Sequence, residues 1–220
     1  MTENWMNFVD WLSQMDGRLL LAVNGLHTPW LDVFMWTLSD RYVWVPFYLL
    51  LAVCVFRKAQ KPWKALACLL LIGLTITAAD QTCSHLIRPM VERLRPSNLN
   101  NPISDLVHIV NGYRGGRYGF PSCHAANTFA LAVFLSLFFR KTWVSALMLV
   151  WAVMVSFSRL CLGVHYPGDI LVGMLVGSLY AVLFYRVYDY LRRSGSLQNA
   201  YKNALSFCRR PADKGLKEEV

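Results

Sequence analysis

Long apolar runs separated by short polar segments make up most of this 220-residue chain. Runs of this kind are typical of membrane-spanning helices. Several are shorter than the ~20 residues that a span needs, so we expect the helices to extend into the flanking polar residues. The pattern predicts an all-α, polytopic membrane bundle of about six transmembrane helices, with five as the alternative. The runs cover 18–39, 43–56, 64–83, 127–139, 142–157 and 170–190.

The first run is the least regular, because polar residues and a proline interrupt it. It is either one span, or an interfacial amphipathic helix followed by a short span. The apolar side chains that would lead such an interfacial helix are Trp5, Phe8, Trp11 and Leu12. No cleavable signal peptide is predicted, since the first residues lack a basic segment and carry Glu3 and Asp10.

Basic residues lie between alternate pairs of runs, which predicts the orientation of the chain. Lysines and arginines favour the cytoplasmic side, so six spans would place both termini in the cytoplasm. Three polar segments at the ends of the later runs would then meet on the outer face of a bacterial inner membrane. The cytoplasmic basic residues are Arg57, Lys58, Lys61, Lys64, Arg140, Lys141, Arg186, Arg192 and Arg193.

Composition agrees with a membrane protein. Hydrophobic residues make up 55% of the chain, and the mean hydropathy is +0.35. The net charge of +9 is accounted for by the basic loops and tail, and no nucleic-acid-binding module is recognisable. We divide the chain into N-terminal membrane segments (1–63), a core that contains the later runs and their polar flanks (64–190) and a flexible cytoplasmic tail (191–220).

The most informative polar segment runs from Ser158 to Asp169 between two apolar runs. Polar groups are costly beside a bilayer, so such a cluster indicates a functional site. Arg159 offers a planar fork for phosphate oxygens, His165 can act as nucleophile or acid–base, and Asp169 can orient that histidine. A structural salt-bridge cluster at the membrane interface is the alternative for this segment alone.

Two further segments strengthen the functional interpretation. Ser122 precedes an apolar helix as a candidate N-cap, and the unpaired N–H groups of a helix start favour an anion. Upstream, Arg88 and Arg95 are seven residues apart and each is followed by a proline. We predict a short helix that ends at Pro96, with both arginines on one face roughly 10 Å apart.

These three segments resemble the signature of the type 2 phosphatidic acid phosphatase and vanadium haloperoxidase superfamily. The signature reads Lys-x6-Arg-Pro, then Pro-Ser-Gly-His, then Ser-Arg-x5-His-x3-Asp. The third motif is present in full, from Ser158 to Asp169. Arg88 replaces the usual lysine and keeps its positive charge, whereas Cys123 replaces the usual glycine and adds a side chain near the phosphate. The resemblance covers residues from about 64 to 190 and implies that this segment is the catalytic core.

The resemblance implies a role for each matching residue. His165 would attack phosphorus to give a phosphohistidine, Asp169 would hold the imidazole, and His124 would protonate the leaving group and then activate water. The remaining residues would bind the phosphate and offset its charge, namely Arg88, Arg95, Ser122, Cys123 and Arg159. Three guanidinium groups can supply the charge that magnesium supplies elsewhere, so we expect no metal and no cofactor there.

The segment from Ser97 to Phe120 is predicted to select the substrate. Arg114 and Arg117 flank two glycines in a candidate anion-binding loop, although a plain surface loop is an equal alternative. His27, His85 and His108 receive no role. A disulfide between two of the three cysteines beside the motifs is a further alternative if the outer face is oxidising, the three being Cys83, Cys123 and Cys161.

The predicted function is hydrolysis of a membrane lipid phosphate or diphosphate, with undecaprenyl diphosphate or lipid A phosphate as first choices. Phosphatidylglycerophosphate or phosphatidate hydrolysis, or phosphate transfer to another lipid through the same site, are the alternatives. A non-catalytic relic of the site is disfavoured because all the reactive residues are present. We expect no nucleic acid and no obligate protein partner.

Overall fold

The computed structural model describes residues 2–195, 199 and 201–203, and it is helical. The all-α prediction is confirmed: within this described part, an isolated bridge between Leu94 and Tyr118 is the only β pairing. The helices are α1 (Thr2–Asn24), α2 (Pro29–Ser39), α3 (Val45–Ala59), α4 (Pro62–Gln81), the π-helical η1 (Thr82–Ile87), α5 (Arg88–Val91), the 3-10 turn η2 (Ser104–Leu106), α6 (Cys123–Phe139), α7 (Thr142–Cys161) and α8 (Pro167–Ser194).

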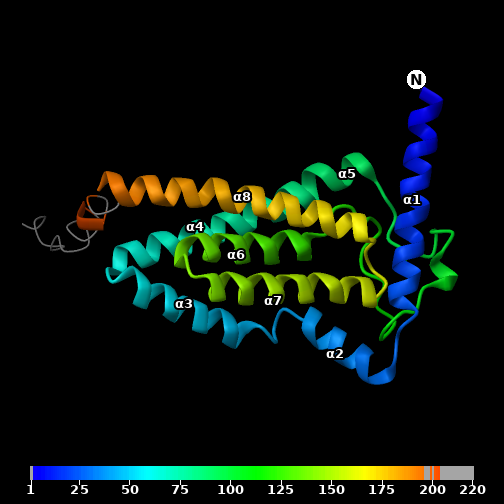
Figure 1. Ribbon diagram of the computed structural model, residues 1–220, viewed down its shortest axis with the longest axis horizontal. Helices are drawn as coiled ribbons and strands as arrows, with labels where there is room; N and C mark the ends of the chain where they lie inside the picture. The colour runs from blue at the N-terminus through cyan, green and yellow to red at the C-terminus, as the bar shows by residue number, and fades with distance from the viewer. Residues whose placement is uncertain (1, 196–198, 200, 204–220) are drawn as a thin grey trace, which may run out of the picture.

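Four long helices form the bundle, and α1 lies across one end of it. Figure 1 shows α4, α6, α7 and α8 running side by side, with α2 and α3 along one edge. Helix α6 packs against α4, α7 and α8 and therefore occupies the centre. Helix α1 crosses the end where α7 stops and α8 begins, and it packs against both.

The first apolar run forms two helices, so its interpretation as one span is wrong. The Gly25 amide donates to Leu21 at the end of α1, and Thr28 caps α2 by accepting from the Leu31 amide at 3.4 Å. Pro29, with its fixed φ, begins α2. Most of the predicted tail (191–220) lies outside the described residues, and the structure describes only the backbone of Trp5.

The later runs extend into their polar flanks, as predicted. Helix α6 begins at Cys123, and α7 continues to Cys161, so both motifs sit at helix ends. In the described residues three helices are long and apolar enough to cross a membrane, Pro62–Val91, Thr142–Cys161 and Pro167–Ser194, and Cys123–Phe139 is a shorter apolar helix. The chain is therefore a helical membrane protein.

Close contact between α6 and α8 fixes the start of both helices. A Cβ atom at Gly177 would lie 2.0 Å from the Ala126 carbonyl oxygen, and one at Gly173 would lie 2.4 Å from that of Ser122. Small residues are typical of such close helix contacts in membranes. Larger side chains at either glycine would push α8 away from Ser122, and with it the residues that α8 contributes to the site.

Candidate active site

The predicted catalytic and phosphate-binding residues converge at the end of the bundle that α1 crosses. Arg95, Ser122, Arg159, His165 and Asp169 are all buried there, although they come from four separate segments. They lie between the last turn of α7, the first turns of α6 and α8, and the loop that follows α5. The structure therefore brings the three sequence motifs together.

The first turn of α8 orients His165. Pro167 begins this helix, and Asp169 reaches back to the helix start, where its Oδ2 accepts from the Tyr166 amide at 2.9 Å. The same Oδ2 lies 3.4 Å from His165 Nδ1. Because the carboxylate is fixed by the helix terminus, it holds one edge of the imidazole ring and leaves the other edge facing the arginines.

Arg95 occupies that other edge and indicates which ring nitrogen is unprotonated. Its Nη1 lies 3.0 Å from His165 Nε2 and 3.1 Å from the Val164 carbonyl oxygen. A guanidinium can only donate, so Nε2 is the accepting nitrogen and Nδ1 carries the proton toward Asp169. The Nε2 lone pair therefore points into the arginine cluster, where an incoming phosphorus atom would meet it.

Burial and positive charge keep His165 neutral. Desolvation, followed by the charges of Arg95, Arg159 and Arg88, lowers the pKa of His165 well below its usual range. Burial, together with Arg159 and Arg88, also lowers the pKa of Arg95 to about 10, which still leaves that guanidinium charged at neutral pH. A neutral imidazole beside charged arginines is the combination that nucleophilic attack on a phosphate requires.

The predicted helix from Arg88 to Pro96 is wrong. Helix α5 covers only Arg88–Val91, because Glu92 adopts a left-handed conformation (φ 50°) and its amide returns to the Arg88 carbonyl. The chain then turns, and the Arg95 amide donates to the Arg117 carbonyl at 3.2 Å. Arg88 and Arg95 thus reach the same site from different directions instead of from one helix face.

Glycines allow the following loop to lie directly on Arg95. A Cβ atom at Gly115 would lie 3.0 Å from Arg95 Nη1, and the backbone there has φ +69°, a conformation that glycine favours. A Cβ atom at Gly119 would lie 3.0 Å from Arg95 Cγ and 3.2 Å from Asp169 Oδ2. This loop, residues 97–120, therefore covers Arg95 and positions its guanidinium, and we call it the covering loop.

Within the described part of the chain, Arg88 and Arg159 each have an unpaired hydrogen-bond donor. Arg88 Nη2 donates to the Pro121 carbonyl at 3.2 Å and to Cys123 Sγ at 3.0 Å, and Arg159 Nη1 donates to Ser39 Oγ. Among the described residues, however, the buried Nε–H groups of both arginines have no acceptor. A buried donor without a partner is costly, and an anion between these arginines would satisfy both.

Ser122 and His124 begin α6 at the edge of the site. Ser122 is the N-cap, as predicted, and its Oγ accepts from the Ala125 amide at 3.4 Å. Its own amide donates to the Asp169 carbonyl at 2.9 Å, which ties α6 to α8. His124 is half-buried, and the neighbours that interact with it electrostatically are Arg159, His165, Arg95 and Arg41.

Arg114 and Arg117 stand apart from this cluster. Arg114 Nη1 donates to the Ser97 carbonyl at 2.8 Å, which closes the loop on itself. Arg117 is exposed, and its guanidinium lies 5.2 Å from the ring centroid of Tyr118. Both arginines belong to the loop that covers the site, but no described contact joins either guanidinium to the buried arginines.

The sequence interpretation missed Arg93, Asp16 and Ser39. Arg93 bridges Asp169 Oδ1 at 2.9 Å and Asp16 Oδ2 at 2.6 Å, and it lies 3.8 Å from the ring centroid of Tyr166. Asp16 Oδ1 also accepts from the Gly168 amide at 2.8 Å. Arg93 lies inside the first motif and could have been noticed there, whereas Asp16 and Ser39 lie on α1 and α2 without any motif.

A cavity of about 560 Å³ runs from the site into the bundle. Polar side chains, among them Ser39, Arg41 and His124, line it together with apolar residues of α3, α4, α6 and α7. A helix rises about 1.5 Å per residue, so the cavity wall from His124 to Leu135 is roughly 16 Å long. The cavity therefore has a polar end beside His124 and a long apolar wall.

The cysteines beside the motifs are free thiols, so the disulfide alternative is not what the structure has. Cys83 and Cys161 are buried, and the thiols of Cys83 and Cys123 contact each other without a bond between them. The carboxylate beside the arginines, Asp169, is paired with Arg93. Three residues with metal-ligand character, His27, Asp32 and His108, lie outside the arginine cluster.

Comparison with known proteins agrees with these observations. Residues 64–193 match the model of the PAP2 superfamily. The lipid A 4'-phosphatase of Bacteroides thetaiotaomicron is 49% identical over 80% of this chain and 78% of its own length, and that of Porphyromonas gingivalis is 36% identical over 84% and 77%. The PAP2-type phosphatidylglycerolphosphate phosphatase of Bacillus subtilis has a similar fold, with a TM-score of 0.61 at 24% identity, over 82% of this chain and 87% of that one.

The match of the family model spans more than half of the chain and contains all three motifs that converge on His165. The relatives are matched over most of their own length, and the fold is shared with a solved structure. This chain belongs to the PAP2 superfamily.

Proposed function

We propose that this PAP2-type membrane lipid phosphatase removes the 4'-phosphate from lipid A. The observation that carries the proposal is the cluster of Arg88, Arg95 and Arg159 around His165, with two buried Nε–H donors that await an anion. The two relatives described above, which are lipid A 4'-phosphatases, support the choice of substrate.

The reaction would proceed in two displacements at His165. Arg88, Arg95 and Arg159 bind the phosphate oxygens, and Arg95 Nη1 moves from His165 Nε2 to one of them. Nε2 then attacks phosphorus while the bond to the sugar oxygen breaks, and His124 gives that oxygen a proton. Water, deprotonated by His124, next attacks phosphorus, the P–N bond breaks, and inorganic phosphate leaves with His165 restored.

The cavity beneath His124 supports a substrate with an apolar chain. Its polar end contains His124 and Arg41, and its roughly 16 Å wall is about half the ~30 Å thickness of a hydrocarbon core. A lipid standing in one leaflet could place a phosphate among the arginines and an acyl chain between α3, α4, α6 and α7. A soluble phosphate ester would leave that apolar surface uncovered.

We further propose that the site opens on the outer face and that α1 lies in that interface. The α3–α4 and α6–α7 turns, where Lys61 and Lys141 lie, are at the opposite end of the bundle (Figure 1). Helix α1 crosses the site end, so it is an interfacial helix. If α2 and α3 cross together, five crossings result, which is the alternative number given by the sequence. The two termini would then lie on opposite faces of the membrane, whereas six spans would place both in the cytoplasm.

Cysteine labelling tests this orientation. In intact cells, Leu99→Cys in the covering loop and Asn7→Cys on α1 should react with a membrane-impermeant thiol reagent, whereas Lys61→Cys should not. All three positions are exposed, and the parent chain gives the background from its own cysteines. Labelling at Lys61→Cys alone would invert the orientation, and labelling at Leu99→Cys without Asn7→Cys would restore six spans.

A substrate panel tests the activity. Purified protein in detergent would receive lipid A, undecaprenyl diphosphate, phosphatidylglycerophosphate and phosphatidate, with free phosphate and product mass as readouts. We expect the highest kcat/KM for lipid A, loss of the 4'-phosphate, and full activity in excess EDTA. A higher kcat/KM for undecaprenyl diphosphate would overturn the substrate, and a loss on chelation that Mg²⁺ restores would overturn catalysis by arginines alone.

A further inference from the structure

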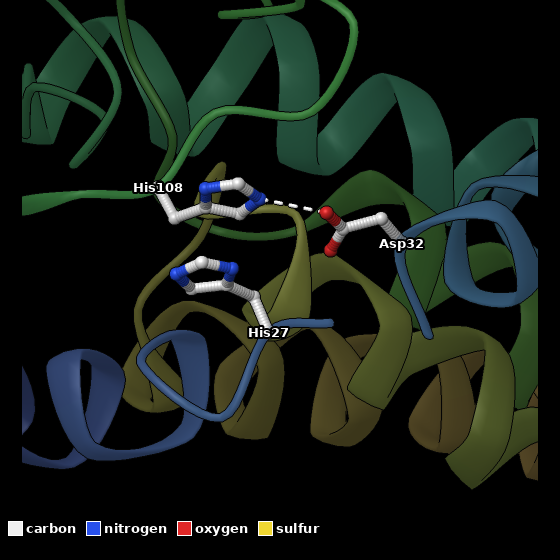
Figure 2. A group of neighbouring side chains, drawn as sticks. All are labelled: His27, Asp32 and His108. Atoms are coloured by element: carbon white, nitrogen blue, oxygen red, sulfur yellow. Dashed lines mark hydrogen bonds and ion pairs between the residues drawn. The ribbon is translucent and has the colours of Figure 1, made fainter. Parts of the chain in front are cut away.

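Three side chains without a catalytic role meet beside the covering loop. His27 lies in the turn between α1 and α2, Asp32 in the first turn of α2, and His108 in the loop after η2 (Figure 2). His108 Nε2 lies 2.8 Å from Asp32 Oδ2, and the two imidazole rings stack with centroids 3.7 Å apart and 7° between their planes. One ligand atom from each of the three residues lies within 4.8 Å of the others.

The backbone around this cluster is held firmly. The fully buried Asn24 side chain accepts from the His108 amide at 2.7 Å and donates to the His108 carbonyl at 3.0 Å. It also donates to the Cys161 carbonyl at 2.8 Å, at the end of α7. Asp32 is fixed by the start of α2, since its amide donates to the Thr28 carbonyl at 2.9 Å. Two of the three side chains thus stand on braced backbone.

We propose that His27, Asp32 and His108 bind a Zn²⁺ ion. Two imidazoles and a carboxylate, with a remaining position for water, are a zinc ligand set, whereas Mg²⁺ and Ca²⁺ prefer oxygen ligands alone. Zinc bonds of about 2.0–2.2 Å require the three ligand atoms to move closer together. They also require one of the two stacked imidazole rings to rotate, because the lone pairs of parallel rings cannot both point at one ion. His27 is exposed in a turn and can rotate and move in this way, and the ion would replace the hydrogen bond between His108 and Asp32.

The ion would join the segments that cover the phosphate site. His108 belongs to the same loop as Gly115 and Gly119, which lie on Arg95, and Asp32 belongs to the same helix as Ser39, which contacts Arg159. A bond from each to one metal would fix this loop and α2 relative to each other. The ion is a clamp and takes no part in phosphate chemistry, so the inference is independent of the proposed function.

Metal binding to purified, chelator-treated and desalted protein tests the proposal without any activity measurement. Titration calorimetry with Zn²⁺ should give one site per chain, and Co²⁺ in its place should give the visible absorption of a low-coordinate site. The melting temperature should rise with Zn²⁺ concentration, because the ion binds the folded chain. Mg²⁺ should produce none of these effects.

Variants then locate the site. His27→Ala removes an exposed ligand and should weaken Zn²⁺ binding more than about 100-fold, since even residues behind the ligands are worth 10–100-fold. His108→Gln provides a second ligand variant, and His85→Ala is the matched control, an exposed histidine in η1 outside the cluster. Absence of Zn²⁺ binding in the parent, or binding that His27→Ala and His108→Gln leave as strong as His85→Ala does, would overturn the proposal.

Discussion

Two histidine–aspartate pairs at the same end of the molecule show how surroundings decide what such a pair can do. In the first, His165 and Asp169 are 1% and 0% exposed, and arginines approach from several segments. In the second, His108 and Asp32 are 30% and 20% exposed, and the nearest ring is another histidine. The residue types are the same, but the neighbours differ.

This difference is the basis for proposing one pair as the nucleophile and its partner and the other as metal ligands. Around His165, fixed positive charge disfavours a bound cation and favours an anion. Burial, followed by the charges of the arginines, lowers the pKa of His165 and keeps its imidazole neutral. Around His108, a second imidazole replaces the arginines, and solvent can reach the nitrogen atoms. We therefore expect phosphate at the first pair and a divalent cation at the second.

Removing each histidine should separate the two pairs most sharply. His165→Ala deletes the nucleophile, so phosphate release should fall to the level of the uncatalysed reaction. His108→Ala should retain most of the turnover, because His108 contacts no residue of the phosphate site through its side chain. Initial rates of phosphate release from lipid A measure both, with equal amounts of folded protein checked by gel filtration. A comparable loss in both variants would contradict the separation.

His124→Ala should give the second-largest loss, because it removes the proton donor and not the nucleophile. General acid–base catalysis is typically worth about 10²–10⁴-fold, so we expect a loss of this size on lipid A. An aryl phosphate has a better leaving group and needs less proton donation, so the loss there should be smaller. Equal losses on both substrates, measured as kcat/KM, would assign His124 another role.

Arg93 positions Asp169, and the pair of His108 and Asp32 has no corresponding arginine among its described contacts. It joins Asp169 to Asp16, and without it the carboxylate could turn away from His165. Misplacement of a reacting group by about 1 Å can cost about 100-fold, so Arg93→Gln should lower kcat by roughly 10–100-fold with little change in KM. Arg93→Lys keeps the charge and should recover part of the rate. A rise in KM at constant kcat would instead place Arg93 on the substrate.

The pH dependence of kcat/KM should reflect the lowered pKa of the buried His165. The neutral imidazole is the reactive form, and the lowered pKa of His165 keeps it neutral below the ordinary histidine value of ~6.5. The acid limb of kcat/KM should therefore lie well below pH 6.5, where the rate falls as protons reach His165. Loss of activity near pH 6.5 would show that burial and the arginines do not lower the pKa of this histidine.

Local spacing predicted the centre of the site, and distant contacts supplied the rest. His165 and Asp169 are four residues apart at a helix start, and serine is a residue type typical of N-caps, as at Ser122. The pairing of His165 with Asp169 and the capping by Ser122 could therefore be predicted from the sequence. The prediction of a helix through Arg95 was wrong because the turn at Glu92 and the pairing of Leu94 with Tyr118 depend on the covering loop.

The contributions of α1 and α2 had no comparable signal. Asp16 is one of several polar residues in α1, and Ser39 is the last residue of α2, so neither stands out in the sequence. Each acquires its role only where the fold places it beside an arginine. The same holds for His27 and His108, which are 81 positions apart in the sequence and stack only in the folded chain. Such contacts follow from packing between distant segments, which a motif does not encode.

Trapping the phosphoenzyme tests the central claim most directly. His124→Ala keeps the nucleophile but slows water attack, so a phosphohistidine should accumulate when the variant receives an aryl phosphate. Acid-free digestion and mass spectrometry would then locate the added phosphate. We predict it on the peptide that contains His165, and none in the double variant His124→Ala/His165→Ala. Phosphate on a peptide that contains His108, or on no histidine at all, would contradict the assignment of the buried pair as the catalytic one.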